Sequence, residues 1–266
     1  MKQIEFTSKN VKPFTNWLKR FASIDTTLLL EIDEDNQKFL AKSYNDERSV
    51  VKYSEISFID AGFAAKKNKE TKRIKAGIYN ISRLMKIMDM YLNTEFTCVF
   101  NYDEILSGDA KDYAALSIKL TNKETKLSVE CTSLNIFKYI SDDLFHNTIG
   151  AVDEIIAFNL TRDLMSKVNT LCVLDNDDKY MSVYSKDSKV YVKGKSFEQL
   201  VYTNAVNETL EDTKLDISKE QFEKLDDENY QISMGEDRIV FKSTDSITTT
   251  VISMVEKDEK FDAKEE

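Results

Sequence analysis

The sequence predicts an α+β fold made of two similar halves, each with two helices among β-strands. Short alternating runs rich in Val, Ile, Tyr and Phe recur along the chain and indicate strands. Segments with apolar residues at helical spacing interrupt these runs. The order helix, strands, helix, strands occurs twice, offset by roughly 140 residues, which predicts an internal repeat.

The first half of the chain begins with a predicted helix over 12–22, in which Pro13 is tolerated in the first turn. Phe14, Trp17, Leu18 and Phe21 follow the i, i+3, i+4, i+7 spacing and predict one buried stripe. A second helix is predicted over residues 80–92. The strand-like segments of this half are 27–32, 38–44, 49–58, 96–102 and 115–132.

The second half repeats this order with little identity to the first. A short strand leads into a predicted helix over 161–172, with Leu164, Val168 and Leu171 facing inward, and another helix is predicted over 218–225. The strand-like segments of this half are 155–160, 180–185, 189–194, 199–204, 230–235, 238–243 and 248–255.

The length of 266 residues suits two domains of about 130 residues each. Hydrophobic residues at 41% and charged residues at 32% are typical of a soluble globular protein. We expect an N-terminal domain, a connector, a C-terminal domain and an acidic tail. Their predicted bounds are 1–138, 139–154, 155–257 and 258–266.

The sequence predicts a cytoplasmic protein. No apolar run approaches the roughly 18 residues of a membrane span, and the first residues show no apolar signal-peptide region. Cys98, Cys131 and Cys172 are widely spaced, which disfavours a disulfide framework or a zinc site and fits a reducing compartment.

The net charge of −10 is unevenly distributed. Residues 1–150 contain 22 Lys+Arg against 21 Asp+Glu, whereas residues 151–266 contain 15 against 26. An acidic protein can still bind DNA through a local basic surface, because steering depends on the local potential.

Basic residues lie outside the apolar stripes of three predicted helices. Such residues either solvate an ordinary amphipathic helix or form a surface that contacts phosphates without reading bases. The last helix mixes Lys219 and Lys224 with Glu220 and Glu223, so its face is close to neutral. The candidate DNA-binding residues on the other helices are Lys12, Lys19, Arg20, Arg83, Lys86, Arg162 and Lys167.

The segment 66–75 concentrates six basic residues against the single acid Glu70. It is either a solvated loop or a grip on the nucleic-acid backbone, and it lacks the interleaved aromatic residues that stack on single strands. Its basic residues are Lys66, Lys67, Lys69, Lys72, Arg73 and Lys75.

No segment of the sequence predicts an enzyme, a metal site or a cofactor. The acidic clusters 33–36 and 175–178 have the composition of turns and lack the spacing of a calcium loop. The single histidine, His146, is expected to be structural, and there is no Walker, dinucleotide or GxSxG motif.

The chain resembles the sliding clamps of the proliferating cell nuclear antigen and T-even-type phage group. The resemblance extends over nearly the whole length and is best over residues 14–58, which begin FTNWLKRFASIDTT, and over 227–255, which begin DENYQISMGEDR. The resemblance implies a DNA clamp fold of two similar domains, each with two helices packed on antiparallel β-sheet. Three such subunits close head-to-tail into a ring with helices lining the hole. The resemblance also implies a non-enzymatic processivity factor of phage origin.

The resemblance further implies the partners: double-stranded DNA, a DNA polymerase and a clamp loader ATPase, with a homotrimer as the assembly and no membrane. Short peptide tails of the partners would bind a hydrophobic pocket beside the connector and the C-terminal end. The candidate residues, chosen by position and apolarity, are Ile149, Val152, Met254 and Val255. The chain departs from the family in its mixed last helix and in the basic segment 66–75.

Two other functions stay open on the sequence. The chain could be a monomeric DNA-binding polymerase accessory protein of the same fold, gripping duplex mainly through residues 66–75. The resemblance to phage clamps also implies an additional role as a late-transcription coactivator.

Overall fold

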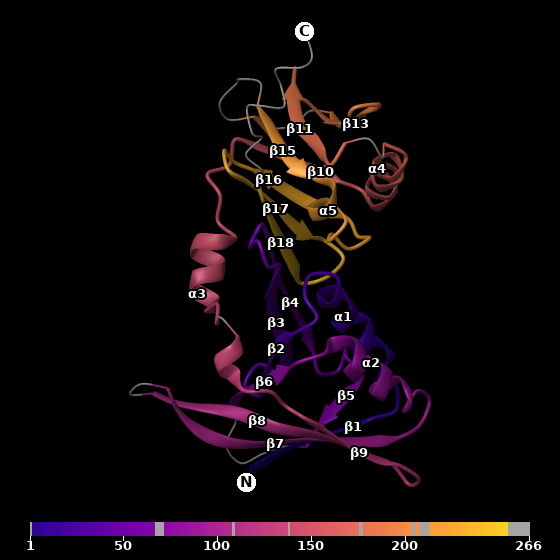
Figure 1. Ribbon diagram of the computed structural model, residues 1–266, viewed down its shortest axis with the longest axis vertical. Helices are drawn as coiled ribbons and strands as arrows, with labels where there is room; N and C mark the ends of the chain where they lie inside the picture. Colours follow the sequence, from indigo (N-terminus) through magenta and orange to yellow (C-terminus); the bar gives the residue numbers. More distant parts are fainter. Residues whose placement is uncertain are drawn as a thin grey trace. The chain divides into compact units, whose positions relative to one another are not determined.

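The computed structural model divides the chain into two compact units (Figure 1). Unit 1 comprises Met1–Tyr44 and Lys52–Ile140, and unit 2 comprises Asn45–Val51 and Ser141–Glu266. The structure describes residues 2–66, 72–107, 110–137, 139–175, 178–203, 206–207 and 213–254.

In its described residues, unit 1 combines nine strands with two principal helices. Among these elements, helix α1 has the bounds expected from the sequence, and helix α2 is shorter than expected at both ends. The elements in chain order are β1 (Lys2–Ser8), α1 (Lys12–Ala22), β2 (Leu28–Asp33), β3 (Lys38–Tyr44), β4 (Val50–Ser57), β5 (Phe63–Ala65), β6 (Arg73–Ile78), α2 (Ile81–Asp89), β7 (Phe96–Ser107), β8 (Ala110–Thr121), β9 (Lys126–Glu130) and the 3₁₀ turn η1 (Leu134–Ile136).

Unit 2 opens with two helical turns in the predicted connector and then repeats the order of unit 1. Its elements are α3 (Asp142–Leu144), the π-helical turn η2 (Phe145–Ile149), β10 (Ile156–Leu160), α4 (Arg162–Leu174), β11 (Tyr180–Lys186), β12 (Lys189–Lys193), β13 (Glu198–Thr203), β14 (Val206–Asn207), β15 (Lys214–Ser218), α5 (Lys219–Phe222), β16 (Tyr230–Met234), β17 (Arg238–Ser243) and β18 (Thr248–Ser253).

The strand order confirms the predicted repeat. In unit 1 the strands pair in the orders β1-β7-β8-β9 and β6-β2-β3-β4, and in unit 2 in the orders β10-β16-β17-β18 and β15-β11-β12-β13. In unit 1, the neighbours in the order β1-β7-β8-β9 pair antiparallel, as do β6-β2 and β2-β3, whereas β6 pairs parallel with β8. In unit 2, the neighbours in both orders pair antiparallel. The α+β fold of two similar domains is therefore confirmed.

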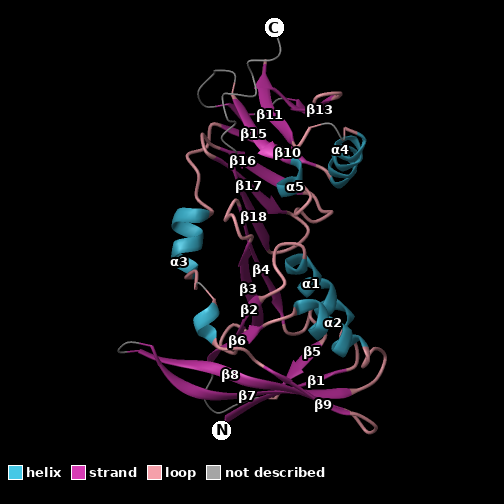
Figure 2. Cartoon of the chain, in the orientation of Figure 1, coloured by secondary structure: helices cyan, strands magenta, loops and turns pink. Residues whose placement is uncertain are grey.

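Helix α1 anchors the core of unit 1 as its apolar spacing predicts. Phe14, Trp17, Leu18 and Phe21 are each at most 3% exposed. Burial of side chains of this size contributes roughly 1.5–3 kcal/mol each. Helix α1 packs beside α2 (Figure 2), so their outer faces form one surface.

Several strands escaped the sequence analysis. Strand β6 begins inside the basic segment 66–75, which was expected to be a loop or a site for the nucleic-acid backbone. Arg73 and Lys75 hide the strand pattern of a segment that pairs with β2. The strand-like segment 115–132 forms the end of β8, which begins earlier at Ala110, and the whole of β9. The other strands that were not predicted are β1, β5, β14 and β15.

Two helices of unit 2 also differ from expectation. Helix α4 buries Met165, Val168 and Cys172, whereas Leu164 and Leu171 are only half-buried. The predicted helix 218–225 contracts to the four residues of α5, which begins with a capping box from Ser218 and Gln221. No helix among the described residues is both long and apolar enough to cross a membrane.

Candidate functional site

The outer surface of α1 and α2 is the strongest basic surface that the predicted residues form. Lys12, Lys19, Arg83 and Lys86 are exposed, and none has an ion-pair partner among the described residues. We call these four side chains the helix cations. They lie on two adjacent rigid elements, and such side chains can contact phosphates without reading bases.

The local sequence explains why these helices begin where they do. Pro13 lies in the first turn of α1, where its missing N–H costs no helical hydrogen bond. The side chain of Asn80 accepts a hydrogen bond of 2.7 Å from the backbone N–H of Arg83 and caps α2. Arg20, the remaining predicted residue on α1, is half-buried, and its carbonyl accepts a hydrogen bond of 3.1 Å from Nζ of Lys52.

The corresponding helices of unit 2 carry a weaker positive surface. Arg162 and Lys167 are exposed on α4, but Arg162 forms an ion pair of 3.0 Å with Asp245. Lys219 of α5 points inward, where its Nζ lies 2.8 Å from a carboxylate oxygen of Asp175. The two units therefore share a topology but differ in the charge of their helices.

The described part of the basic segment 66–75 is largely paired with acidic residues. Lys66 lies 3.4 Å from Glu5, and Lys75 forms an ion pair with Asp112. Nε of Arg73 lies 2.8 Å from Glu31, which is 2% exposed; the two atoms are close but not aligned as a hydrogen bond.

Of the remaining members of that segment, Lys72 lies among the described residues and contacts an aromatic ring. The ammonium of Lys72 lies 5.1 Å from the centre of the Tyr113 ring. Lys67 and Lys69 lie outside the described residues. These contacts reduce the charge that the described members present to a nucleic acid.

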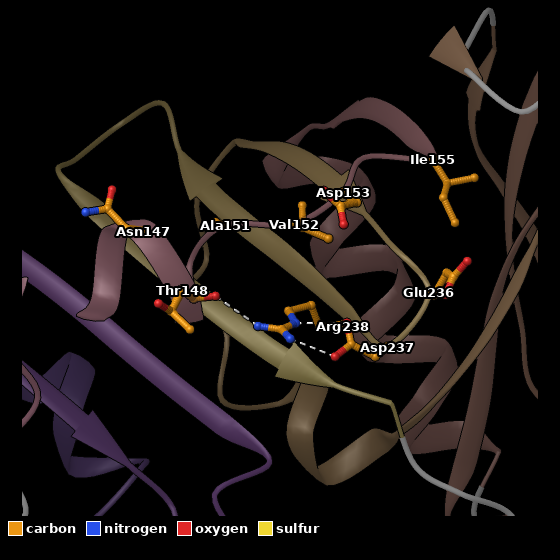
Figure 3. Close-up of a pocket in the computed structure, with 9 residues that line it drawn as sticks. All are labelled: Asn147, Thr148, Ala151, Val152, Asp153, Ile155, Glu236, Asp237 and Arg238. Carbon is orange, nitrogen blue, oxygen red and sulfur yellow. Dashed lines mark hydrogen bonds and ion pairs between the residues drawn. The ribbon is translucent and has the colours of Figure 1, made fainter. Parts of the chain in front are cut away.

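A pocket in unit 2 lies between the connector and the turn from β16 to β17 (Figure 3). It has a volume of about 680 Å³ and is lined by Asn147, Thr148, Ala151, Val152, Asp153, Ile155, Glu236, Asp237 and Arg238.

The structure brings only part of the predicted peptide-binding set to this pocket. Val152 lines it, and the carbonyl of Ile149 accepts a hydrogen bond of 3.4 Å from Arg238. Met254 is exposed and does not line the pocket, although its N–H donates a hydrogen bond of 2.7 Å to the carbonyl of Asp237. Val255 lies outside the described residues. The lining is more polar than the sequence analysis expected.

Sequence reasoning missed the residues that give this pocket its polarity. Besides Asp153 of the connector, the charged ones are Glu236, Asp237 and Arg238, from a turn that the sequence marks only as a glycine between two strand-like runs. Nη1 of Arg238 donates a hydrogen bond of 3.1 Å to the carbonyl of Thr148, and the guanidinium also holds both carboxylate oxygens of Asp237. The hydrogen bond from Arg238 holds the pKa of the Asp237 carboxyl below its usual value.

The cysteines of the chain are not arranged for nucleophilic chemistry. Burial raises the pKa of the Cys98 thiol, and it raises the pKa of Cys131 to about 12 and that of Cys172 to about 11. These thiols are protonated at neutral pH, whereas the thiolate is the reactive form. The described residues include no group of three acidic, histidine or cysteine side chains placed to hold a metal ion.

Comparison with known proteins identifies the fold. No family model and no curated protein matches the sequence. Among solved structures, the DNA polymerase III beta chain of Streptococcus pneumoniae matches 97% of this chain and 66% of its own, with a TM-score of 0.65 and 12% identity. The Helicobacter pylori beta clamp matches 97% of this chain and 64% of its own, with a TM-score of 0.63 and 11% identity.

A clamp of another type matches over its whole length. A. fulgidus PCNA, in a structure with the C-terminal region of FEN-1, matches 96% of this chain and 100% of its own, with a TM-score of 0.60 and 10% identity. The chain therefore spans about two thirds of the length of the bacterial clamps and the full length of this PCNA. The chain has the DNA clamp fold, as its sequence predicts.

Proposed function

We propose that the protein is a sliding clamp: a non-enzymatic processivity factor that encircles duplex DNA and tethers a DNA polymerase. The observation that carries this proposal is the pair of helices α1 and α2, which present the helix cations on a DNA clamp fold. Cationic side chains attract any phosphate backbone, and salt weakens this attraction. Because the attraction does not depend on the base sequence, it holds no fixed position on DNA and allows a ring to slide.

A ring requires each chain to bind the next through two different surfaces. Two edge strands could provide them, since β9 in unit 1 pairs with β8 and β13 in unit 2 pairs with β12, with no second neighbour among the described residues. An exposed strand edge can pair with a strand of another chain. The match to PCNA over 100% of its length supports two domains per chain, hence a homotrimer with six domains.

The pocket beside the connector supports the tethering part of the proposal. It is concave, it is bounded by the connector, and Val152 is among the residues that line it. Two of the matched structures contain peptide segments: the H. pylori beta clamp with a DNA ligase peptide and A. fulgidus PCNA with the C-terminal region of FEN-1. We propose that the polymerase and a clamp loader ATPase dock at this pocket through short segments.

Several finer points of the proposal rest on the resemblance of the sequence. These are the phage origin, the cytoplasmic location in a host cell, the domain bounds and the additional role in late transcription. The monomeric accessory protein is the competing function. It depends on residues 66–75 as the main grip, and the ion pairs of Lys66, Arg73 and Lys75 weigh against that grip.

The mass of the full-length protein in solution tests the proposal. Light scattering between about 1 and 50 μM should give three times the mass of the chain, because homodimerisation alone would yield only four domains. Electron microscopy of the same sample should show rings. A monomeric mass across this range, with no rings, would favour the accessory protein. Retention on circular duplex and release after linearisation would then establish that the ring encloses DNA.

A further inference from the structure

Specific contacts hold the connector against the turn between β16 and β17 and form one wall of the pocket. The backbone N–H of Ile155 donates a hydrogen bond of 2.9 Å to the carbonyl of Met234, which fixes the end of the connector to β16. Gly235 then lies directly against Val152, because a Cβ on Gly235 would collide with Cγ2 of Val152 and lie 3.1 Å from the carbonyl of Asp153. Glycine at this position allows the connector to approach the β16–β17 turn.

The charged side chains that line the pocket differ in whether they have a partner of opposite charge. Arg238 is fully engaged, since it binds the carboxylate of Asp237 and the carbonyls of Thr148 and Ile149 at the end of η2. Asp237 is neutralised by the same guanidinium. Asp153 and Glu236 are exposed, and neither has an ion-pair partner in the described part of the chain. Two uncompensated carboxylates therefore border the pocket.

Apolar surface accompanies these carboxylates. Val152 and Ile155 line the pocket and are half-buried, so part of each side chain is available to a ligand. Figure 3 shows Glu236 and Ile155 on one side of the pocket and Val152 with Asp153 beside them. The lining thus combines a small apolar surface with negative charge.

We propose that this pocket binds a partner peptide through a lysine or arginine side chain, with the apolar neighbours of that residue contacting Val152 and Ile155. The inference rests on the proposed function and specifies the chemistry of the docking segment. The long aliphatic stem of Lys or Arg can cover apolar surface while its charged end reaches a carboxylate. A wholly apolar tail would leave Asp153 and Glu236 without a partner.

The chain's own C-terminal segment is a poorer occupant. Residues 255–266 follow Met254, which is bonded to the pocket residue Asp237, but they contain six acidic residues and three lysines. Their negative charge opposes that of the pocket. A partner peptide with a net positive charge is complementary to it.

A random peptide library displayed on phage, selected against the full-length protein, tests the inference. Peptides eluted from the wild-type protein should carry Lys or Arg at one recurring position next to apolar residues. An enriched peptide and its Lys→Gln or Arg→Gln counterpart would then be compared by fluorescence anisotropy. The basic peptide should bind roughly three- to tenfold more tightly, and the difference should shrink as salt rises.

Three protein variants locate the effect. The double variant Asp153→Asn/Glu236→Gln should remove the preference for the basic peptide and leave binding of the neutral one unchanged. The matched double variant Asp187→Asn/Asp227→Asn removes two exposed carboxylates elsewhere in unit 2 and should change neither. Gly235→Ala should weaken both peptides, because it displaces the connector wall.

The outcomes separate the two proposals. Equal binding of the basic and neutral peptides, with both lost in Gly235→Ala, would overturn the cationic preference and leave the docking function standing. If the enriched peptides bind all three variants as tightly as they bind the wild type, the pocket is not the docking site. Removing residues 255–266 tests the tail as the occupant. If the truncated protein binds the peptides at least tenfold more tightly than the full chain, the tail occupies the pocket.

Discussion

The indole Nε1 of Trp17 donates a hydrogen bond of 2.9 Å to the hydroxyl of Ser54, and both side chains are buried. This bond joins α1 to β4 and satisfies the one polar atom of a large aromatic side chain in the core. Nζ of Lys52, on the same strand, donates a hydrogen bond to the carbonyl of Arg20 near the end of the helix. Strand β4 therefore fixes the helix that carries Lys12 and Lys19.

Replacing Ser54 with alanine should destabilise the protein by about 1–3 kcal/mol, because the buried indole N–H then loses its acceptor. Trp17 is the single tryptophan of the chain, so its fluorescence during urea unfolding reports on this contact. Ser57→Ala is the control, because Ser57 lies on the same strand but its hydroxyl bonds, among the described residues, only to the exposed Asp60, where water can replace it. If Ser54→Ala lowers the free energy of unfolding less than Ser57→Ala does, the hydrogen bond from Trp17 does not have this structural role.

Reversing the charge of all four helix cations, Lys12, Lys19, Arg83 and Lys86, should weaken binding to duplex DNA without changing oligomerisation. A plot of the logarithm of the binding constant against the logarithm of the salt concentration should become less steep. Its slope should fall in magnitude by about 0.9 for each reversed side chain that contacts a phosphate in the wild type. Each substitution should cost no more than about 0.5 kcal/mol of folding stability, as is usual for surface sites. Anisotropy with labelled duplexes of two unrelated sequences measures the effect.

The control for this experiment is an equal charge change on β11 and β12 of unit 2 and the turn that follows them. Lys186, Lys189, Lys193 and Lys195 are exposed and carry no ion pair within the described residues. Their reversal should leave the salt dependence unchanged. Equal losses in the two variants would mean that net charge, and not the helix surface, governs binding to DNA.

Arg73→Gln should destabilise folding by roughly 1–3 kcal/mol, because it removes a charge from beside the buried carboxylate of Glu31. The partial exposure of Arg73 and the second cation near Glu31, Lys42 at 3.4 Å, reduce the cost below that of a fully buried pair. Affinity for duplex DNA should not change once the measurement is corrected for the folded fraction. If Arg73→Gln greatly weakens binding to duplex DNA and leaves the free energy of unfolding unchanged, residues 66–75 are the main DNA-binding segment.

Asp175 should make the stability of the protein depend on acid pH. Burial raises the pKa of its carboxyl, but the hydrogen bonds from Lys219, Ser196 and the backbone of Lys195 outweigh burial and lower the pKa to about 2. The unfolded chain, with an ordinary pKa near 3.8, therefore takes up the proton first as the pH falls. The contribution is complete above about pH 5 and is lost towards pH 2, and it is on the order of 2 kcal/mol.

Urea unfolding at pH 7 and pH 3 measures this contribution. Asp175→Asn should be less stable than the wild type at pH 7, and the difference between the two proteins should narrow at pH 3. A difference that stays constant between these pH values would show that the carboxylate is not held in its ionised form by these partners.

Leu200→Asp should break the proposed ring. Leu200 is exposed on the edge strand β13, where an added carboxylate would be buried in any interface with a second chain. Light scattering should then give the mass of a single chain, while the unfolding midpoint stays near that of the wild type. Ile247→Asp, an exposed apolar residue between β17 and β18, is the control and should leave the trimer intact.

The sequence predicted the elements whose apolar spacing is uninterrupted. Helix α1 was predicted with its observed bounds, because Phe14, Trp17, Leu18 and Phe21 leave no ambiguity about its buried face. Strand β6 was hidden, because Arg73 and Lys75 lie on it and face acidic partners that come from distant segments. Charged residues that are paired only after folding cannot be recognised as part of a strand from local sequence.

The pocket illustrates the same limit. Val152 was predicted from position and apolarity, but Asp153, Glu236 and Arg238 acquire their roles only when the connector meets the β16–β17 turn. The inward orientation of Lys219 was equally inaccessible, since its acceptor Asp175 lies 44 positions earlier in the chain. Local patterns predict which face of an element is buried, whereas the partners of polar residues depend on the tertiary fold.

The different lengths of α2 and α5, nine residues against four, break the equivalence of the two halves of the chain. Arg162 and Lys219 on the unit-2 helices are paired with acidic residues, so in the proposed ring of three chains the wall around the hole would alternate between strongly and weakly cationic sectors. Its electrostatic symmetry would be threefold although its architecture is close to sixfold. A duplex inside would be drawn towards one unit-1 sector at a time and would rest off the ring axis, with three equivalent positions between which it could step as the protein moves along DNA.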